Sequence, residues 1–246
     1  EELAELNLLA GKKAKASAAF KPAYLYLQTG VNLLGPAGWQ RRYDQALELH
    51  EEAAETAYLS GDFDTMEQLK ETVLKEATDK MHKVRVYQIK VQAEIAKNQP
   101  VVGINAAREA LALFGIDIPA KPTPAEASEA LAQTKARWEQ RGIDDLVNLP
   151  RMTDPAQLAV ARLLQKLYFV SYVVDPLLYQ VVVSKLVSLS IDYGNDPPSS
   201  PEGYIQYALI LCGLGDIENG YKSGKLAEQL VQDFGKEAIT SAATVG

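Results

Sequence analysis

The chain has 246 residues, a formal net charge of −7 and one cysteine, and 47% of its residues are hydrophobic. This composition predicts one large domain or two lobes with a buried core. The negative charge disfavours nucleic acid and anionic membranes as partners. Cys212 has no second cysteine for an internal disulfide, and we expect a buried thiol because it ends the apolar run ALILC.

The ends of the chain and its apolar stretches bear on its location. The sequence begins at Glu1 without the pattern of a secretory signal peptide and ends inside a helical pattern that follows Gly235. We therefore expect a piece of a longer cytoplasmic polypeptide. The apolar stretch 167–184 is interrupted by Asp175-Pro176. It predicts two buried core helices and no membrane insertion.

Glycines and capping residues divide the chain into helices. Glycine at the end of a helical pattern is typical of a left-handed C-terminal cap. Seven positions fit: Gly35, Gly61, Gly115, Gly142, Gly194, Gly215 and Gly235. Residues typical of helix N-caps stand at the start of the helices that follow, and several of them precede a proline. These are Asp62, Thr123 (with Glu126 placed for a capping box), Asp154, Asp175, Ser200 and Asp216.

Between these marks the apolar residues recur with a helical period, and no stretch alternates with a period of two. The sequence therefore predicts an all-α protein of about eleven helices. We place them near residues 2–19, 21–34, 39–60, 62–78, 80–98, 100–114, 124–141, 155–174, 176–193, 201–214 and 216–234.

Similar helix-to-helix turns recur along the chain. They align on Phe20, Phe63, Pro100, Pro176 and Ile217, and three residues later stand Ala23, Met66, Gly103, Tyr179 and Gly220. A compact residue one turn into the second helix lets two backbones approach closely. The pattern predicts a tetratricopeptide-like superhelix of antiparallel hairpins, degenerate near residue 138. We expect two continuous lobes, 1–115 and 124–246, joined by a linker at 116–123.

Two stretches imitate chemical motifs. In CGLGDIENGYKSGKL, Gly213 and Gly215 lack the third glycine of a dinucleotide fingerprint. The GYKSGK part has one residue too few for a phosphate loop, and Leu226 stands where such a loop needs Ser or Thr. We interpret these glycines as a helix cap and as packing positions. The sequence thus predicts no cofactor site and no catalytic residues.

The histidines do not form a metal motif. His50 in LELHEEAAE has Ala54 at the position where a zinc protease needs its second histidine. His50 falls on the apolar stripe of its helix, which predicts a packed or groove-lining side chain. The second lobe is rich in tyrosine, including Tyr168, Tyr172 and Tyr179. Core packing and a ligand or peptide groove both remain open for them. We take His50 and these three tyrosines as the candidate groove residues.

Four segments together resemble a known helical region: AAFKPAYLYLQTGVNLLG, WQRRYDQALELHEEAAETAYLSGDFDTMEQL, IKVQAEIAKNQPVVGINAAREALALFGIDIP and VSKLVSLSIDYGNDPPSSPEGYIQYALILCGLGDIENGYKSGKLA. They are similar to the tetratricopeptide-like segment of large bacterial signalling hybrids, which are common in cyanobacteria. Those proteins join a serine/threonine kinase, an AAA or STAND-type ATPase, a GAF domain and often a histidine kinase. The resemblance implies a non-catalytic regulatory segment of a multidomain kinase.

Two functions are open at this point. The segment is expected to hold a partner protein or a neighbouring domain of the same polypeptide on a concave surface. Alternatively, it receives a small-molecule inducer, as helical repeats of STAND proteins do. A broad groove would favour the first function, and a deep pocket with converging polar groups would favour the second.

Overall fold

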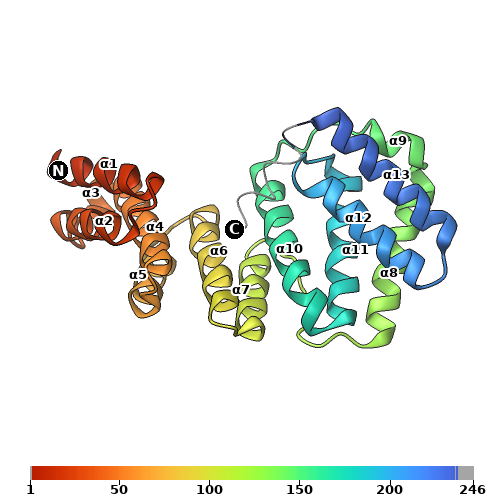
Figure 1. Ribbon diagram of the computed structural model, residues 1–246, viewed down its shortest axis with the longest axis horizontal. Coiled ribbons are helices and arrows are strands. Elements are labelled where there is room, and N and C mark those ends of the chain that lie inside the picture. Colours follow the sequence, from red (N-terminus) through yellow and green to blue (C-terminus); the bar gives the residue numbers. More distant parts are fainter. Residues whose placement is uncertain (1, 236, 238–246) are drawn as a thin grey trace. The chain divides into compact units, whose positions relative to one another are not determined.

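The computed structural model describes residues 2–235 and 237, and within them the protein is all-α with a helical-repeat fold. No strand occurs in this described part (Figure 1). Its thirteen helices are α1 (Glu2–Ala16), α2 (Phe20–Leu34), α3 (Gly38–Arg41), α4 (Tyr43–Leu59), α5 (Phe63–Glu76), α6 (Met81–Ala96), α7 (Pro100–Ala112), α8 (Pro124–Arg141), α9 (Ile143–Val147), α10 (Pro155–Val174), α11 (Pro176–Tyr193), α12 (Ser199–Gly213) and α13 (Ile217–Phe234).

Ten of the eleven expected helices are present as single helices, and α8, α10 and α11 have the expected bounds. Two short helices, α3 and α9, were not predicted. The single helix expected at 39–60 is wrong, because the backbone of Arg42 leaves the helical region (φ −145°, ψ 54°) and separates α3 from α4. The helical pattern expected after Gly235 falls on residues of which the structure describes only residue 237.

The predicted caps are confirmed with one exception. All seven cap glycines have positive φ. Thr123 and Glu126 form the reciprocal capping box, and Asp62, Asp154, Asp175 and Asp216 each accept a backbone N–H of the following helix. Ser200 is the exception, because it lies inside α12. The carboxylate of Asp196 instead accepts the N–H of Ser199 at 3.1 Å.

The chain divides into two compact units, Glu1–Ala106 and Ala107–Gly246. The boundary falls inside α7, whereas the sequence placed it at the linker 116–123. Part of that linker is built into the second unit. Ile118 is buried, and its carbonyl oxygen accepts a hydrogen bond from Arg108 Nε at 2.6 Å.

In the first unit α4 is the central helix, with α2 and α5 both packed against it. One core cluster joins α1, α2 and α4 through Leu8, Leu27 and Leu49. A second cluster joins α4, α5 and α6, and it includes Met66 and Ile89. The hairpin α1–α2 is thus tied to the next hairpin through the buried face of α4, as a repeat architecture requires.

In the second unit α11 packs against α8, α10 and α12, and α12 forms a hairpin with α13. The buried residues of α11 lie on most sides of the helix, which is expected of a helix surrounded by others. Asp175 ends α10 and caps α11, so the apolar stretch 167–184 forms two helices. Within the described residues, no helix is sufficiently long and apolar to span a bilayer.

Gly220 of α13 packs against Cys212 of α12. Gly220 lies so close to α12 that a Cβ atom there would stand 2.4 Å from Cys212 Sγ and 3.1 Å from the carbonyl oxygen of Ala208. This confirms a packing role for the glycine. The prediction of a buried thiol is wrong, because Cys212 is exposed. Its neighbours in the run, Ile210 and Leu211, point into the core instead.

Candidate functional site

A row of carboxylates on α4 is bound by cations from two other helices of the first unit. Glu48, Glu51, Glu52 and Glu55 recur at helical spacing, so they share one side of α4. From α1, Lys12 Nζ lies 2.6 Å from Glu48, and Lys15 Nζ lies 2.6 Å from Glu52 and 3.0 Å from Glu55. We call these carboxylates and their cations the α4 ion network.

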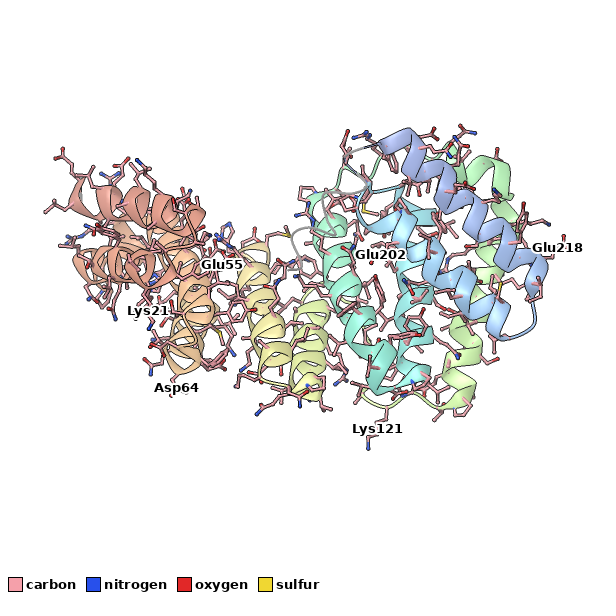
Figure 2. The ribbon with its side chains drawn as sticks, in the orientation of Figure 1. Lys21, Glu55, Asp64, Lys121, Glu202 and Glu218 are labelled. Carbon is pink, nitrogen blue, oxygen red and sulfur yellow. The ribbon has the colours of Figure 1, made fainter. Side chains whose placement is uncertain are left out.

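From α6, Arg85 binds three members of the same row. Its Nη2 atom lies 2.6 Å from Glu52 and 2.7 Å from Glu55, and its Nη1 atom lies 3.3 Å from Glu51. Figure 2 labels Glu55, whose carboxylate receives both Lys15 and Arg85. The α4 ion network therefore joins helices from three successive hairpins.

Burial and pairing act on the carboxylates in opposite directions. Burial alone would raise the pKa of Glu52, but its ion pairs with Lys15 and Arg85 outweigh burial, so its pKa is lowered. Burial prevails at Glu51, whose pKa is raised. The Glu52 side chain is only 6% exposed. A buried carboxylate that loses a cation is costly, so Glu52 is the most sensitive member of the network.

His50 lies on a different side of α4. Nδ1 is 2.7 Å from the carbonyl oxygen of Ala46, and the ring centroid is 4.9 Å from that of Trp39. Because a carbonyl only accepts, Nδ1 carries the proton, and in the neutral ring Nε2 is then an acceptor. Burial lowers the pKa of His50, which favours this neutral form. His50 is packed and also lines a groove, so both predicted features are present.

The groove at His50 lies over α4, between α2 and α5, and has a volume of about 220 Å³. His50 and Ala53 are contributed by α4. The walls come from α2 and α5, and they include the side-chain amides of Gln28, Asn32 and Gln68. We call it the His50 groove.

The structure brings the three candidate tyrosines together in the second unit. The ring of Tyr179 lies 6.5 Å from that of Tyr168 and 5.2 Å from that of Tyr172. Tyr168 and Tyr179 are buried, whereas Tyr172 is 62% exposed. The hydroxyl of Tyr179 donates to Gln206 Oε1 at 2.8 Å, and burial raises its pKa to about 12. Two of the three tyrosines are thus core residues.

Tyr168 is held by a carboxylate of α12. Its hydroxyl donates to Glu202, which also accepts from Gln165 Nε2. Glu202 is labelled in Figure 2, on α12. Burial, together with this hydrogen bond, raises the pKa of Tyr168. These bonds join α10 to α12, so the aromatic cluster presents only Tyr172 to a ligand.

A second, larger cavity of about 440 Å³ lies in the second unit, lined by α8, α10, α11 and the segment 116–119. Thr134 Oγ1 stands 2.9 Å from Ser188 Oγ and 3.1 Å from the carbonyl oxygen of Ser184. The Oγ atom of Ser184 is buried and has no hydrogen-bond partner among the described residues. Arg137 Nε lies 3.5 Å from Asp192 at the same cavity. We call it the α8–α11 pocket.

The glycines of the stretch that imitates nucleotide motifs lie at the end of α12 and inside α13. Gly215 has φ +88° after the end of α12, as the helix-cap interpretation predicts. Gly220 and Gly224 lie inside α13. Lys225 Nζ lies 2.7 Å from Glu228, one turn further along the same helix.

Neither family models, nor curated proteins, nor solved structures give a match to this chain. The resemblance to bacterial signalling hybrids therefore stays a hypothesis from the sequence. In the described residues, no group of three or more His, Cys, Asp or Glu side chains is arranged to hold a metal ion.

Sequence reasoning missed the α4 ion network and both cavities. The acidic row was visible in the sequence, since LELHEEAAE places Glu48, Glu51, Glu52 and Glu55 at helical spacing. Its cations were not identifiable, because Lys15 and Arg85 come from segments thirty or more residues away from their carboxylate partners, on either side. Each cavity depends on three helices that are distant in the sequence or separated by loops, and no local pattern encodes either cavity.

Proposed function

We propose that this chain is a non-catalytic regulatory and interaction module of a cytoplasmic, multidomain signal-transduction kinase. Its helical-repeat surface would mediate contacts with a partner protein or with neighbouring domains of the same polypeptide. The setting in a kinase rests on the sequence resemblance. The interaction role is supported by the helical-repeat fold, whose usual use is to present an extended binding surface.

The α4 ion network is the observation that carries this proposal. One arginine on α6 and two lysines on α1 share four carboxylates of α4. A partner that binds one cation or one carboxylate of the network leaves the remaining charged side chains without their counter-ions. Because the members belong to three hairpins, binding at one place would shift the packing of the others. The network thus supplies a physical route for transmission through the module.

The test uses the complete polypeptide that contains this segment. We expect it to include a kinase domain, and we expect Arg85→Gln to change its rate of phosphate incorporation from labelled ATP. Arg141→Gln is the control, because Arg141 is exposed and lies outside the network. A polypeptide without a kinase domain would contradict the proposal. So would a rate unaffected both by Arg85→Gln and by deletion of the segment.

The α8–α11 pocket supports a second function, the reception of a small-molecule inducer. Its volume of about 440 Å³ falls within the range of roughly 300–1,000 Å³ typical of small-molecule sites. Ser184 adds a buried hydroxyl that no group in the described part of the chain bonds. A metabolite panel would test this function: a ligand that raises the melting temperature of the wild type but not of Ser188→Val supports the sensor, and no such ligand argues against it.

A further inference from the structure

The lining of the His50 groove is uncharged. Its ten residues, all within the described part of the chain, are Tyr24, Gln28, Val31, Asn32, His50, Ala53, Thr65, Gln68, Leu69 and Thr72. None is acidic, lysine or arginine. This is unusual for a chain in which 23% of the residues are charged. A charged ligand group would lose its hydration here without gaining an ion pair, so the lining selects a neutral ligand.

The groove also holds hydrogen-bonding groups that the protein itself does not use. His50 is 93% buried (7% exposed), yet among the described residues no group bonds its Nε2 atom. Gln28, Asn32 and Gln68 are exposed, and among the described residues no group bonds their side-chain amides, which are therefore free to bond a ligand in place of water. The groove therefore offers one fixed acceptor, at His50, and three amide groups that both donate and accept.

The spacing of these groups matches an extended polypeptide. Gln28 and Asn32 are four residues apart on α2, as Gln68 and Thr72 are on α5. Four residues of helix rise about 6 Å. Two residues of extended chain advance about 6.8 Å, and main-chain groups that face the same way repeat at that distance. The two walls can therefore follow successive main-chain amides of one bound segment.

We propose that the His50 groove binds an uncharged, extended polypeptide segment of a partner protein, with a main-chain N–H donated to His50 Nε2 and main-chain carbonyls accepting from the wall amides. The volume of about 220 Å³ lies below the roughly 300 Å³ at which small-molecule sites begin. It suits the anchoring residues of a longer chain. This proposal specifies the interaction role given under Proposed function. It rests on that role in one respect, namely that the partner is a protein.

The experiment selects ligands for the complete 246-residue chain from a phage-displayed library of random heptapeptides. Enriched sequences are synthesised with acetylated and amidated ends, and their affinities are measured by calorimetry. We expect peptides with uncharged central residues. The variant Gln28→Ala/Gln68→Ala should bind them about tenfold or more weakly, since two hydrogen bonds are lost. Gln40→Ala, an exposed glutamine of α3 outside the groove, should bind them as the wild type does.

The role of His50 is tested on the peptide side as well. N-methylation removes one main-chain donor at a time. Methylation of the peptide residue whose N–H donates to His50 Nε2 should weaken binding to the wild type by about tenfold. The same methylated peptide should show no further loss with His50→Phe, which keeps an aromatic ring beside Trp39 but has no acceptor. Circular dichroism of His50→Phe checks that the fold is retained. If this variant does not fold, the test relies on Gln28→Ala/Gln68→Ala, whose substituted residues are exposed.

Three outcomes would overturn the proposal. The library yields no peptide that binds the wild type saturably. The selected peptides bind Gln28→Ala/Gln68→Ala as tightly as the wild type. Or glucose, used as a polyol probe, binds saturably in the groove while no peptide does. The peptide-binding proposal and the kinase proposal can fail separately. If peptides bind as expected but the whole polypeptide has no kinase activity, the groove proposal is supported and the signalling proposal is contradicted.

Discussion

Lys15 of α1 and Arg85 of α6 share the carboxylate of Glu52. Lys15 Nζ lies 2.6 Å from its Oε2 atom, and Arg85 Nη2 lies 2.6 Å from its Oε1 atom. One buried side chain of α4 thus connects two helices that come from different hairpins. The first three hairpins are joined by charge as well as by apolar packing, and this has consequences for stability and for coupling.

Removing the cation of α6 should destabilise the first unit. Arg85→Gln leaves Glu52 with one partner, and we expect a loss of about 2 kcal/mol, between the values typical of exposed and buried pairs. Lys12→Gln breaks the exposed pair with Glu48 and should cost less than about 1 kcal/mol. Urea denaturation followed by Trp39 fluorescence, with Trp138→Phe in every variant, measures the first unit alone. Equal losses for the two variants would contradict the central place of Glu52.

The stability of the first unit should depend on pH through His50. Burial lowers the pKa of His50 below its ordinary value of 6.5. As the pH falls through 6.5, the unfolded chain takes up a proton that the folded protein resists, so the free energy of unfolding decreases. One histidine contributes a slope of at most about 1.4 kcal/mol per pH unit. This part of the slope should disappear in His50→Phe.

The measurement for this prediction is urea denaturation of the wild type and His50→Phe at pH 7.5, 6.5 and 5.5, again with Trp39 as the reporter. The two proteins should differ in slope only below pH 6.5. Parallel curves over the whole range would show that His50 is not held in its neutral form.

Two glycines of the second unit should respond differently to the same substitution. At Gly194, with φ +103° and ψ 170°, an added Cβ would stand 2.3 Å from the carbonyl oxygen of Pro150. At Gly142, with φ +80° and ψ 141°, no atom of the described residues beyond its two chain neighbours would lie within 4 Å of an added Cβ atom. Gly142→Ala should cost about 1–2 kcal/mol through backbone strain alone. Gly194→Ala should cost about 3 kcal/mol or more, because the strain and the clash add.

Denaturation followed by Trp138 fluorescence, with Trp39→Phe in both variants, compares these glycines in one unit. If Gly194→Ala were no worse than Gly142→Ala, the contact between the segments at Pro150 and Gly194 would not contribute to stability. The backbone bonds there predict otherwise, since Asn195 donates to Pro150 O at 2.9 Å and Met152 donates to Asn195 O at 3.0 Å.

Local signals in the sequence predicted the helices well, and they failed where tertiary contacts decide. Thr123 and Asp175 cap their helices as expected, because a cap needs only residues two or three positions away. Ser200 was wrongly expected to cap α12, because the helix already begins at Ser199 and the carboxylate of Asp196 accepts the N–H of Ser199. Cys212 was misassigned because an apolar run does not reveal which of its members face the core.

The candidate site was predicted only in part. His50 was identified from its place on an apolar stripe, and it lines a groove. The groove itself depends on α2 and α5 meeting over α4, and the α4 ion network depends on residues far apart in the sequence. Neither has a local signature.

Hydrogen–deuterium exchange of the wild type, Arg85→Gln and the control Arg141→Gln tests most directly whether the α4 ion network couples the hairpins. Arg85 reaches α1 through Glu52 and Glu55, which it shares with Lys15. We expect Arg85→Gln to increase the exchange of amides in α1 as well as in α4 and α6, and we expect Arg141→Gln to leave all three helices unchanged. An increase confined to α6 and the adjoining part of α4, with α1 as protected as in the wild type, would contradict this expectation.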